Sequence, residues 1–386
     1  MIKALHLFAN HKVTGPAELA LDTALALEKS RSDWECHFLP AHHPKDPSWL
    51  KDLAKEKMAR LVEVEGLRLQ KHYNPIRAHL DSRILARYLD HHPVDLIHCH
   101  LPNDHLVAGA ALAARKRNCH PIPIIRTVYD GEPLKPNWRN KKSLTKNCTG
   151  AICFTRTVQQ QLQNGLWSLP EDRVRLVDPP IDTDLFSPPT MEDQNRYREE
   201  MGLPKDAYVV GIVARMQTHR RFGPLLEAVR IVADHIPQFR FVIIGRGTHQ
   251  DKVARDPVRK LGLEKIVLFA GYRLGENYRT ALQTFDVKVF LVPGSDGTCR
   301  AVREALASGI PVVSSQRGIL PTLIEDGKTG RVIEDTPDNI AKVLIDISSS
   351  PEQLAEMKKA SRRNAKKRFS FQNYVSAIFD LWERSL

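Results

Sequence analysis

Residues 289–332 read VFLVPGSDGTCRAVREALASGIPVVSSQRGILPTLIEDGKTGRV, and their pattern indicates the class of fold. An apolar run ends at Pro293, a polar loop follows, and a helix that carries Glu304 leads to a second apolar run at 310–313. Short apolar runs that alternate with helices are typical of a parallel sheet. The loop before the helix is suited to bind an anion, because free backbone N–H groups and the positive end of the helix dipole meet there.

The same alternation of strands and helices extends over the whole chain and restarts in its second half. The pattern predicts strands at 2–8, 34–39, 60–64, 94–99, 122–128, 150–155, 173–178, 208–213, 239–244, 265–269, 286–292, 310–315 and 330–333. It predicts helices at 16–29, 76–91, 104–117, 221–235, 247–261, 337–349, 351–367 and 371–385. We therefore expect two Rossmann-like, doubly wound α/β domains in tandem, with the active site in a central cleft that both domains face.

A proline-rich segment separates the two halves. Residues 178–189 read DPPIDTDLFSPP, and the four prolines interrupt any regular element. We place the domain boundary within this segment, which gives domains 1–187 and 188–368 and a final helix in 369–386.

The charge balance of the 386-residue chain favours an anionic ligand. Lys and Arg number 57 against 45 Asp and Glu, a net charge of +12, which suits phosphorylated molecules, anionic lipid or nucleic acid. Basic residues concentrate at 115–146 and at 358–368, and a solvated helix face is the simplest explanation for the second run. Nucleic acid is not an expected partner, because the sequence has no aromatic-rich basic strand and no recognition-helix motif.

The sequence predicts a cytoplasmic protein. No apolar run approaches the roughly 20 residues that a membrane span needs, and the chain opens directly with an expected strand instead of a signal peptide. Six cysteines are scattered without the spacing of a zinc site, which favours reduced thiols. They are Cys36, Cys99, Cys119, Cys148, Cys153 and Cys299.

Several motifs resemble those of the retaining glycosyltransferases of family 4, which have the GT-B fold. The family signature is an acidic residue, seven intervening residues and Glu-Ala, followed by a Gly-x-Pro-Val-Val strand. Here Asp296 takes the first position, where the family usually has Glu, Glu304 takes the second, and residues 309–313 read GIPVV. The later segment 325–330, EDGKTG, is similar to the Asp-Gly-x-Thr-Gly turn of the family. The resemblance extends over nearly the whole chain.

The resemblance implies that the second domain binds a nucleotide-sugar donor. Arg215 and Arg220 match the two cations that hold the donor diphosphate in the family, and fixed cations can neutralise the charge that develops on a leaving diphosphate. Glu304 would hold the ribose hydroxyls and Asp296 the donor sugar. Further donor contacts are expected from Gly15, Arg246, Gly297, Thr298, Cys299, Arg300 and Ala301.

The first domain is implied to bind the acceptor, and the helix in 369–386 to cross back to it. His98, His100 and Asn103 match a His-x-His strand end of the family. Tyr129 ends another strand, where many members carry a histidine near the reacting centre. His98 and His100 also point to one face of their strand, which would allow a metal site, but no third ligand with suitable spacing is evident.

The implied function is that of a hexosyl- or heptosyltransferase that retains the anomeric configuration. It would use a UDP-, GDP- or ADP-sugar and a hydroxyl of a cell-surface glycan or glycolipid, such as lipopolysaccharide. No cofactor and no metal are expected, because the two arginines supply the positive charge. The polar segment 130–147, with Arg139, Lys141 and Lys142, is expected either to meet the anionic inner face of the cell membrane or to bind an anionic soluble acceptor.

Three other functions stay open on the sequence alone. A nucleotide-sugar 2-epimerase has the same architecture and would turn over without an acceptor. A non-catalytic relative would keep the fold and bind sugar without transferring it. An NAD-dependent oxidoreductase shares the doubly wound fold, but the turn after the first expected strand, NHKVTGP at 10–16, lacks the Gly-x-Gly-x-x-Gly fingerprint.

Overall fold

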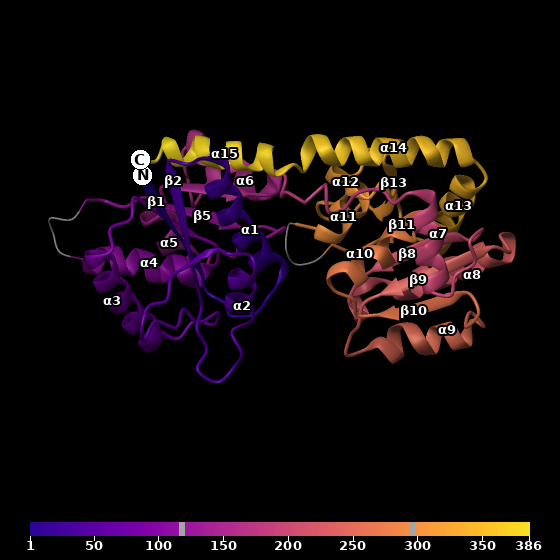
Figure 1. Cartoon of the computed structure of the whole chain (residues 1–386), viewed down its shortest axis with the longest axis horizontal. Coiled ribbons are helices and arrows are strands. Elements are labelled where there is room, and N and C mark those ends of the chain that lie inside the picture. Colours follow the sequence, from indigo (N-terminus) through magenta and orange to yellow (C-terminus); the bar gives the residue numbers. More distant parts are fainter. Residues whose placement is uncertain (116–119, 294–297) are drawn as a thin grey trace. The chain divides into compact units, whose positions relative to one another are not determined.

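The computed structural model of the chain describes residues 1–115, 120–293 and 298–386 (Figure 1). Two parallel sheets, each accompanied by helices, give the α/β class that the alternating pattern predicted. Within the described ranges, no helix combines the length and the apolar character that crossing a membrane requires.

The described residues form two compact units. The first contains residues 1–180, Thr298 and the final helix α15 (Phe371–Glu383), and the second contains residues 181–293 and 299–370. The chain leaves the first unit after Pro180. This position lies within the proline-rich segment, a few residues before the boundary placed on the sequence.

The sheet of the first unit has seven parallel strands in the order β3-β2-β1-β4-β5-β6-β7. The strands are β1 (Ile2–Phe8), β2 (Trp34–Pro40), β3 (Arg60–Leu61), β4 (Leu96–Cys99), β5 (Ile124–Val128), β6 (Gly150–Cys153) and β7 (Val174–Leu176). The order reverses between β1 and β4, whose register pairs His6 with His98. Doubly wound sheets bind ligands at the carboxyl ends of their strands, next to such a reversal.

Helices pack on both faces of this sheet. They are α1 (Gly15–Ser30), α2 (Trp49–Glu56), α3 (Pro75–His91), α4 (Pro102–Ala114), α5 (Trp138–Lys146), α6 (Arg156–Gln163) and α15. Along β1, Ala4 and Phe8 share a core with residues of α1 and α15, whereas Leu5 and Leu7 share one with α3 and α4. Because side chains alternate along a strand, His6 lies on the face that α15 covers.

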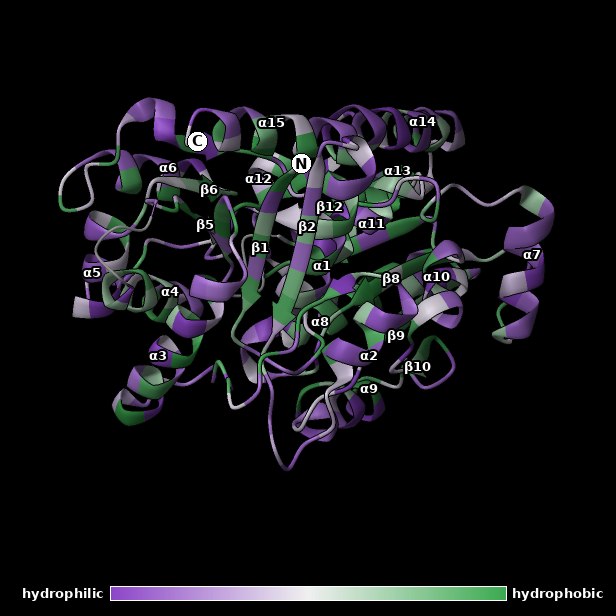
Figure 2. Cartoon of the chain, turned by 60° about the vertical axis from the view of Figure 1, so that its left-hand side comes forward, coloured by the Kyte–Doolittle hydropathy of each residue, from purple (hydrophilic) through white to green (hydrophobic). Residues whose placement is uncertain are grey.

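The sheet of the second unit has six parallel strands in the order β10-β9-β8-β11-β12-β13. They are β8 (Tyr208–Val213), β9 (Phe239–Ile244), β10 (Val267–Gly271), β11 (Val287–Phe290), β12 (Val312–Ser315) and β13 (Gly330–Ile333). The order reverses between β8 and β11. Both β8 and β9 are mostly green in Figure 2, as expected for parallel strands with two covered faces.

The helices of the second unit are amphipathic. They are α7 (Met191–Glu200), α8 (Phe222–His235), α9 (Asp256–Lys260), α10 (Gly275–Gln283), α11 (Arg300–Ala307), α12 (Leu320–Leu323), α13 (Pro337–Ser348) and α14 (Pro351–Arg368). A short 3-10 helix, η2 (Thr218–Arg220), precedes α8, and a π-helical turn, η3 (Asp251–Arg255), precedes α9. Helix α14 is largely purple in Figure 2, which reflects its run of basic residues.

The predicted strands and long helices match the structure closely, whereas several short helices were missed. The polar segment 130–147 was not among the predicted helices, yet it contains α5, whose first turn is capped because Asn137 Oδ1 accepts from the Asn140 N–H at 3.0 Å. Likewise α7 forms in the polar stretch after the prolines, where Thr190 Oγ1 accepts from the Asp193 N–H at 3.1 Å. Caps stabilise short helices that have little apolar periodicity of their own.

Candidate active site

Two glycines join the loops that follow β8 and β9. Gly245 adopts a φ of +142°, and a Cβ there would lie 2.1 Å from the carbonyl oxygen of Ala214. A Cβ on Gly247 would lie 2.1 Å from the carbonyl oxygen of Met216. Because a side chain would clash in either place, only glycine fits there, and the backbones of the two loops are in direct contact.

These paired loops carry two of the cations predicted to bind the donor. Arg215 lies between Ala214 and Met216, is exposed to solvent, and has no hydrogen-bond or ion-pair partner in the described part of the chain. Arg246 is also exposed, and its guanidinium stacks over the Tyr272 ring at 4.4 Å from the centroid. Both side chains therefore stand at the carboxyl edge of the sheet and are available to an anion.

Arg220 lies at the same edge, in η2. One guanidinium nitrogen donates to the carbonyl oxygen of Val292, just past β11, at 2.6 Å. That bond holds Arg220 beside the reversal of strand order between β8 and β11. The structure therefore brings Arg215 and Arg220 to the edge where ligands of such sheets bind.

The neighbouring Arg221 has a different environment. It adopts a left-handed backbone, φ 60°, where α8 begins, and its Nε donates to Asp335 Oδ2 at 2.8 Å. Arg317 pairs with the same carboxylate oxygen at 2.5 Å. Burial alone would raise the pKa of Asp335, but the bonds from Arg317 and Arg221 outweigh it and lower that pKa. Arg221 is thus engaged in holding η2 in place.

Glu304, the predicted ribose ligand, is held by two neighbours. It lies on α11 with only 3% of its surface exposed. One carboxylate oxygen accepts from the Tyr278 hydroxyl and the other accepts from Arg300 Nε at 2.8 Å. Burial and the adjacent Glu304 carboxylate raise the pKa of Tyr278 well above its usual range, so the phenol remains a donor. The carboxylate is therefore fixed in orientation, and a ribose hydroxyl would share it with Arg300.

The start of α11 contains the remaining predicted donor contacts. Thr298 and Cys299 are buried, and Cys299 adopts a left-handed backbone, φ 38°, where the helix begins. Arg300 and Ala301 are half-buried in the first turn, whose N–H groups have no partner within the helix. Asp296 and Gly297 lie outside the described residues.

A buried lysine beneath this turn was not predicted. Lys288 lies on β11 with no exposed surface, and its ammonium group donates to the carbonyl oxygen of Ala301. Burial lowers its pKa from 10.5 to about 7, although the nearby Glu304 acts in the opposite direction. The signal in the sequence is a lone lysine inside the run FDVKVF, which we interpreted simply as an apolar strand.

In the first unit, Gly15 opens helix α1. Thr14 Oγ1 caps the helix by accepting from the Ala17 N–H at 3.3 Å. A Cβ on Gly15 would meet no other atom within 4 Å, so local packing does not require glycine there. Open space above a helix N-terminus suits an anionic ligand, and the donor contact predicted for Gly15 stays a prediction.

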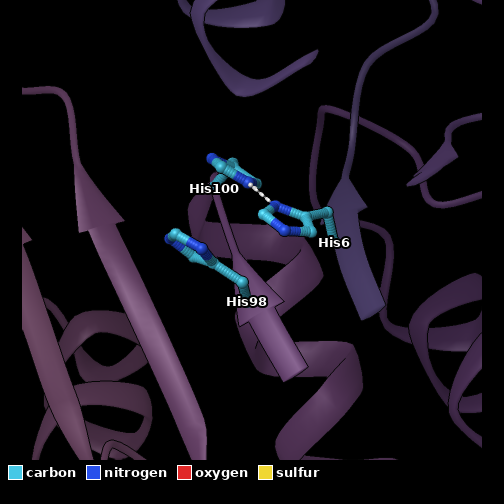
Figure 3. A group of neighbouring side chains, drawn as sticks. All are labelled: His6, His98 and His100. Carbon is cyan, nitrogen blue, oxygen red and sulfur yellow. Dashed lines mark hydrogen bonds between the residues drawn. The ribbon is translucent and has the colours of Figure 1, made fainter. Parts of the chain in front are cut away.

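Three histidines meet at the reversal of strand order in the first unit (Figure 3). His6 comes from β1, while His98 and His100 come from β4 and the residue that follows it. His6 Nδ1 and His100 Nε2 share a hydrogen bond at 3.1 Å, and His98 Nε2 lies 2.7 Å from Thr127 Oγ1. The sequence showed no third histidine near His98 and His100, because His6 lies more than 90 positions away and joins them only through the pairing of β1 with β4.

The cluster is closed to solvent. All three imidazoles are fully buried, and the Trp382 ring of α15 lies 5.6 Å from those of both His6 and His98. Burial lowers the pKa of each, that of His6 to about 3, so the rings are neutral at ordinary pH.

Among the described residues, these three histidines are also the group whose side chains lie close enough together to hold a metal ion. One ring nitrogen from each lies within 4.8 Å of the others. However, the rings of His98 and His100 stack, with their centroids 4.4 Å apart and an angle of 19° between their planes. His100 is also hydrogen-bonded to His6. This arrangement is that of stacked, hydrogen-bonded neutral imidazoles.

The predicted acceptor-side residues are buried near the ends of β4 and β5, where they form hydrogen bonds with neighbouring segments. His100 Nδ1 and the Tyr129 hydroxyl lie 2.9 Å apart, and Tyr129 is 6% exposed. Asn103 donates its side-chain N–H groups to the carbonyl oxygens of Gln70 and Lys71 at 2.9 and 2.7 Å. A direct contact of His98, His100, Asn103 or Tyr129 with an acceptor stays a prediction, and their burial favours an indirect role.

A buried ion pair that the sequence analysis missed fixes the same edge. Asp104 accepts from the backbone N–H groups of Ala9 and Leu101 at 2.8 to 3.1 Å, and Arg126 lies 3.5 Å away. Neither charged side chain is appreciably exposed. Three segments that are distant in the sequence are thereby joined where β1, β4 and β5 end.

Two parallel, doubly wound units in one chain are the architecture of the GT-B class. Two family models match the chain: Glycosyltransferase Family 4 over residues 14–185 and Glycosyl transferases group 1 over residues 193–366. The chain therefore belongs to the group 1 glycosyltransferases of family 4.

Curated relatives agree with this membership. The D-inositol 3-phosphate glycosyltransferase of Corynebacterium glutamicum is 27% identical over 258 residues, which cover 62% of this chain and 60% of that protein. The putative glycosyltransferase EpsD of Bacillus subtilis is 25% identical over 370 residues, covering 90% of this chain and 93% of the relative. The chain thus spans less than two thirds of the inositol-phosphate relative and nearly all of EpsD.

Solved structures share the fold. A glycosyltransferase from Rickettsia africae superposes with a TM-score of 0.79 at 14% identity, covering 100% of this chain and 98% of the other. Anabaena HepE in complex with UDP gives a TM-score of 0.77 at 16% identity, with full coverage of both chains. At these identities the similarity establishes the GT-B fold alone.

Proposed function

We propose that the protein is a retaining glycosyltransferase that moves a sugar from a nucleotide-sugar to a hydroxyl of a glycan or glycolipid. The observation that carries the proposal is that Arg215, Arg220 and the start of α11, the helix of Glu304, all follow the carboxyl ends of strands β8 and β11 in the second sheet. An exposed arginine that has no partner in the described ranges, an anchored arginine and the first turn of a helix are a suitable set of groups for a diphosphate.

The chemistry follows from where negative charge develops. As the bond between the sugar and the diphosphate breaks, Arg215 and Arg220 stabilise the charge on the leaving phosphate. Glu304, oriented by Tyr278 and Arg300, accepts a ribose hydroxyl. The acceptor hydroxyl attacks from the face that the diphosphate leaves, and a leaving phosphate oxygen takes its proton. The cations of the chain then do the electrostatic work that a metal ion does in other enzymes.

UDP is the first donor nucleotide to test, because HepE structures contain UDP and UDP-glucose. For the acceptor we propose a surface glycan or a lipid-linked glycan, including lipopolysaccharide, in the cytoplasm or at the inner face of the membrane. The lipopolysaccharide outer core galactosyltransferase WaaB shares the fold with a TM-score of 0.69 at 17% identity, covering 98% of this chain and 99% of that chain.

Thermal unfolding with UDP, GDP, ADP and their sugars tests the donor class. We expect one nucleotide to raise the melting temperature of the wild-type protein and to lose this effect in Arg215→Ala. The matched control is Arg230→Ala, an exposed arginine on α8 that pairs with Asp234 and donates to the Leu261 carbonyl oxygen, so its loss also controls for a lost backbone contact. Stabilisation by NAD instead of any nucleotide diphosphate would contradict the transferase, and release of an epimerised donor without acceptor would favour the 2-epimerase.

A further inference from the structure

A cavity of about 730 Å³ lies at the amino edge of the second sheet. Its walls are the segment before α7, the turns that lead into β11 and β12, and one face of α14. Because these turns precede the strands, the cavity lies at the opposite edge from Arg215 and Arg220. Its volume is within the range of roughly 300–1,000 Å³ that small-molecule sites occupy.

One wall of the cavity is apolar. Pro188, Pro189 and Met191 form its outer part, and Phe285 and Ile310 form its floor. Phe285 and Ile310 are buried in the core of the unit, while Met191 is 82% exposed. Such a wall accepts a hydrocarbon chain, because its burial removes apolar surface from water.

Another part of the lining is cationic. Helix α14 lines the cavity with five basic side chains at helical spacing, and no acidic residue is among the lining residues. They are Lys358, Lys359, Arg362, Arg363 and Lys366. This is the basic run that the sequence analysis explained as a solvated helix face, and the proposed transferase chemistry does not use it.

The five cations differ in how far they are already engaged. Lys358 pairs with Asp286 and Lys359 with Glu356, each at 2.8 Å. Arg362 donates to three backbone carbonyl oxygens of its own unit at 2.6 to 3.0 Å. Arg363 and Lys366 are exposed and make no hydrogen bond or ion pair with any described residue. Two charges at the mouth of the cavity are therefore available for an anion.

Two buried polar atoms in the lining have no partner among the described residues. Ser308 Oγ and Gln283 Oε1 make no hydrogen bond there, although each residue is only 2% exposed. The Gln283 side chain cannot simply turn away, because its Nε2 donates to the Ser187 carbonyl oxygen at 2.6 Å. Buried polar atoms without a partner are uncommon in native proteins, and a hydroxyl-bearing ligand in the cavity would satisfy both.

We propose that this cavity binds a phosphate-headed amphiphile, namely an anionic phospholipid whose head group carries hydroxyls. The acyl chain lies against Pro188, Pro189 and Met191, above the buried Phe285 and Ile310. The phosphate meets Arg363 and Lys366, and head-group hydroxyls reach Gln283 and Ser308. The ligand is a membrane lipid and not a soluble phosphate ester, because a free ester would leave the apolar wall in water. The site is separate from the proposed donor site and does not depend on the transferase reaction.

Calorimetric titration with short-chain lipids below their micelle concentration tests the site. We expect dihexanoyl-phosphatidylglycerol to bind the wild-type protein, with dihexanoyl-phosphatidylcholine about tenfold weaker or more, since the zwitterionic head weakens the charged contacts. Inorganic phosphate should not bind. Equal binding of inorganic phosphate would identify a plain anion site and overturn the proposal.

Variants separate the cavity from the general charge of α14. Lys366→Glu and Arg363→Glu should each weaken phosphatidylglycerol binding about tenfold, and Met191→Glu should weaken it through the apolar wall. These side chains are exposed, so the fold should be kept, and circular dichroism checks this. The matched control is Lys367→Glu, the next residue of the same helix but outside the cavity lining. An equal loss in Lys367→Glu would assign the binding to diffuse helix charge.

Co-sedimentation with vesicles identifies the source of the lipid. The wild-type protein should sediment with phosphatidylglycerol vesicles, and Arg363→Glu should reduce the bound fraction more than Lys367→Glu does. Binding of the short-chain lipid without any such effect on vesicle binding would make the ligand a soluble ester and contradict the membrane source.

Discussion

At the scale of single residues, the proposed mechanism assigns the chemistry to two arginines, Arg215 and Arg220. We expect Arg215→Ala and Arg220→Ala each to lower kcat by about 100-fold or more, because each removes a preorganised partner of the leaving diphosphate. Arg220→Ala also loses the bond to Val292, so its melting temperature should fall more than that of Arg215→Ala. Steady-state kinetics with the identified donor measure the effect, and wild-type rates in either variant would remove the diphosphate role.

Glu304 has a structural role and a proposed binding role, which two substitutions can distinguish. Glu304→Gln should weaken nucleotide affinity about tenfold or more, since an amide is a poorer acceptor than a carboxylate. It should also lower the melting temperature, because Tyr278 and Arg300 lose a charged partner. Tyr278→Phe is the comparison: it keeps the carboxylate and the bond from Arg300, so it should lower stability but weaken nucleotide affinity less than Glu304→Gln does. An equal loss of affinity for the free base and the nucleotide would exclude ribose contact.

Lys288 should leave a signature in the pH dependence of stability. Its pKa is about 7 in the folded chain and 10.5 when unfolded, so between these values the unfolded state binds more protons. Stability should then rise with pH from about 7 to about 10.5 through this group. Lys288→Met removes the titrating group, and urea unfolding across this range should show a flatter dependence. If the free energy of unfolding rose equally with pH in the variant and the wild type, the lowered pKa of Lys288 would be contradicted.

At the scale of elements, α5 is the surface to test for membrane contact. Its basic side chains lie on the same helix as Trp138, which is 54% exposed and whose ring centroid lies 5.3 Å from that of Tyr73. Reversing Lys141 and Lys142 to Glu should weaken binding to anionic vesicles by about tenfold or more at low salt, as each cation contributes roughly 1 kcal/mol. Lys252→Glu with Lys260→Glu on exposed sites of the second unit is the matched control. Unchanged sedimentation in the α5 variant would leave an anionic soluble acceptor as the alternative.

At the scale of the whole molecule, we expect transfer to be independent of metal. The proposed site neutralises the diphosphate with Arg215 and Arg220, and the buried imidazoles of His6, His98 and His100 are hydrogen-bonded to neighbours. Activity should therefore survive EDTA, and metal analysis of the purified protein should find no stoichiometric zinc. Loss of activity that Mn²⁺ or Mg²⁺ restores would overturn this prediction and make the histidine cluster the first place to look.

The sequence by itself determined the two doubly wound sheets and the family, and it proposed the donor-site residues, whose roles stay predictions. Apolar runs and helical periods are local patterns, and the positions of Arg215, Arg220 and Glu304 follow from motifs only a few residues long. Short polar helices such as α5 and α7 escaped prediction, because their caps outweigh a weak apolar pattern.

Only the tertiary structure decided which distant residues meet and how deeply they are buried. Strand register brings His6 to His100, 94 positions away, and packing of α11 over β11 buries Lys288. The pairing of Glu304 with Tyr278 and the cavity beneath α14 likewise join segments that no local pattern relates. Burial sets the pKa of a group and the need of a polar atom for a partner, and burial is a property of the folded chain.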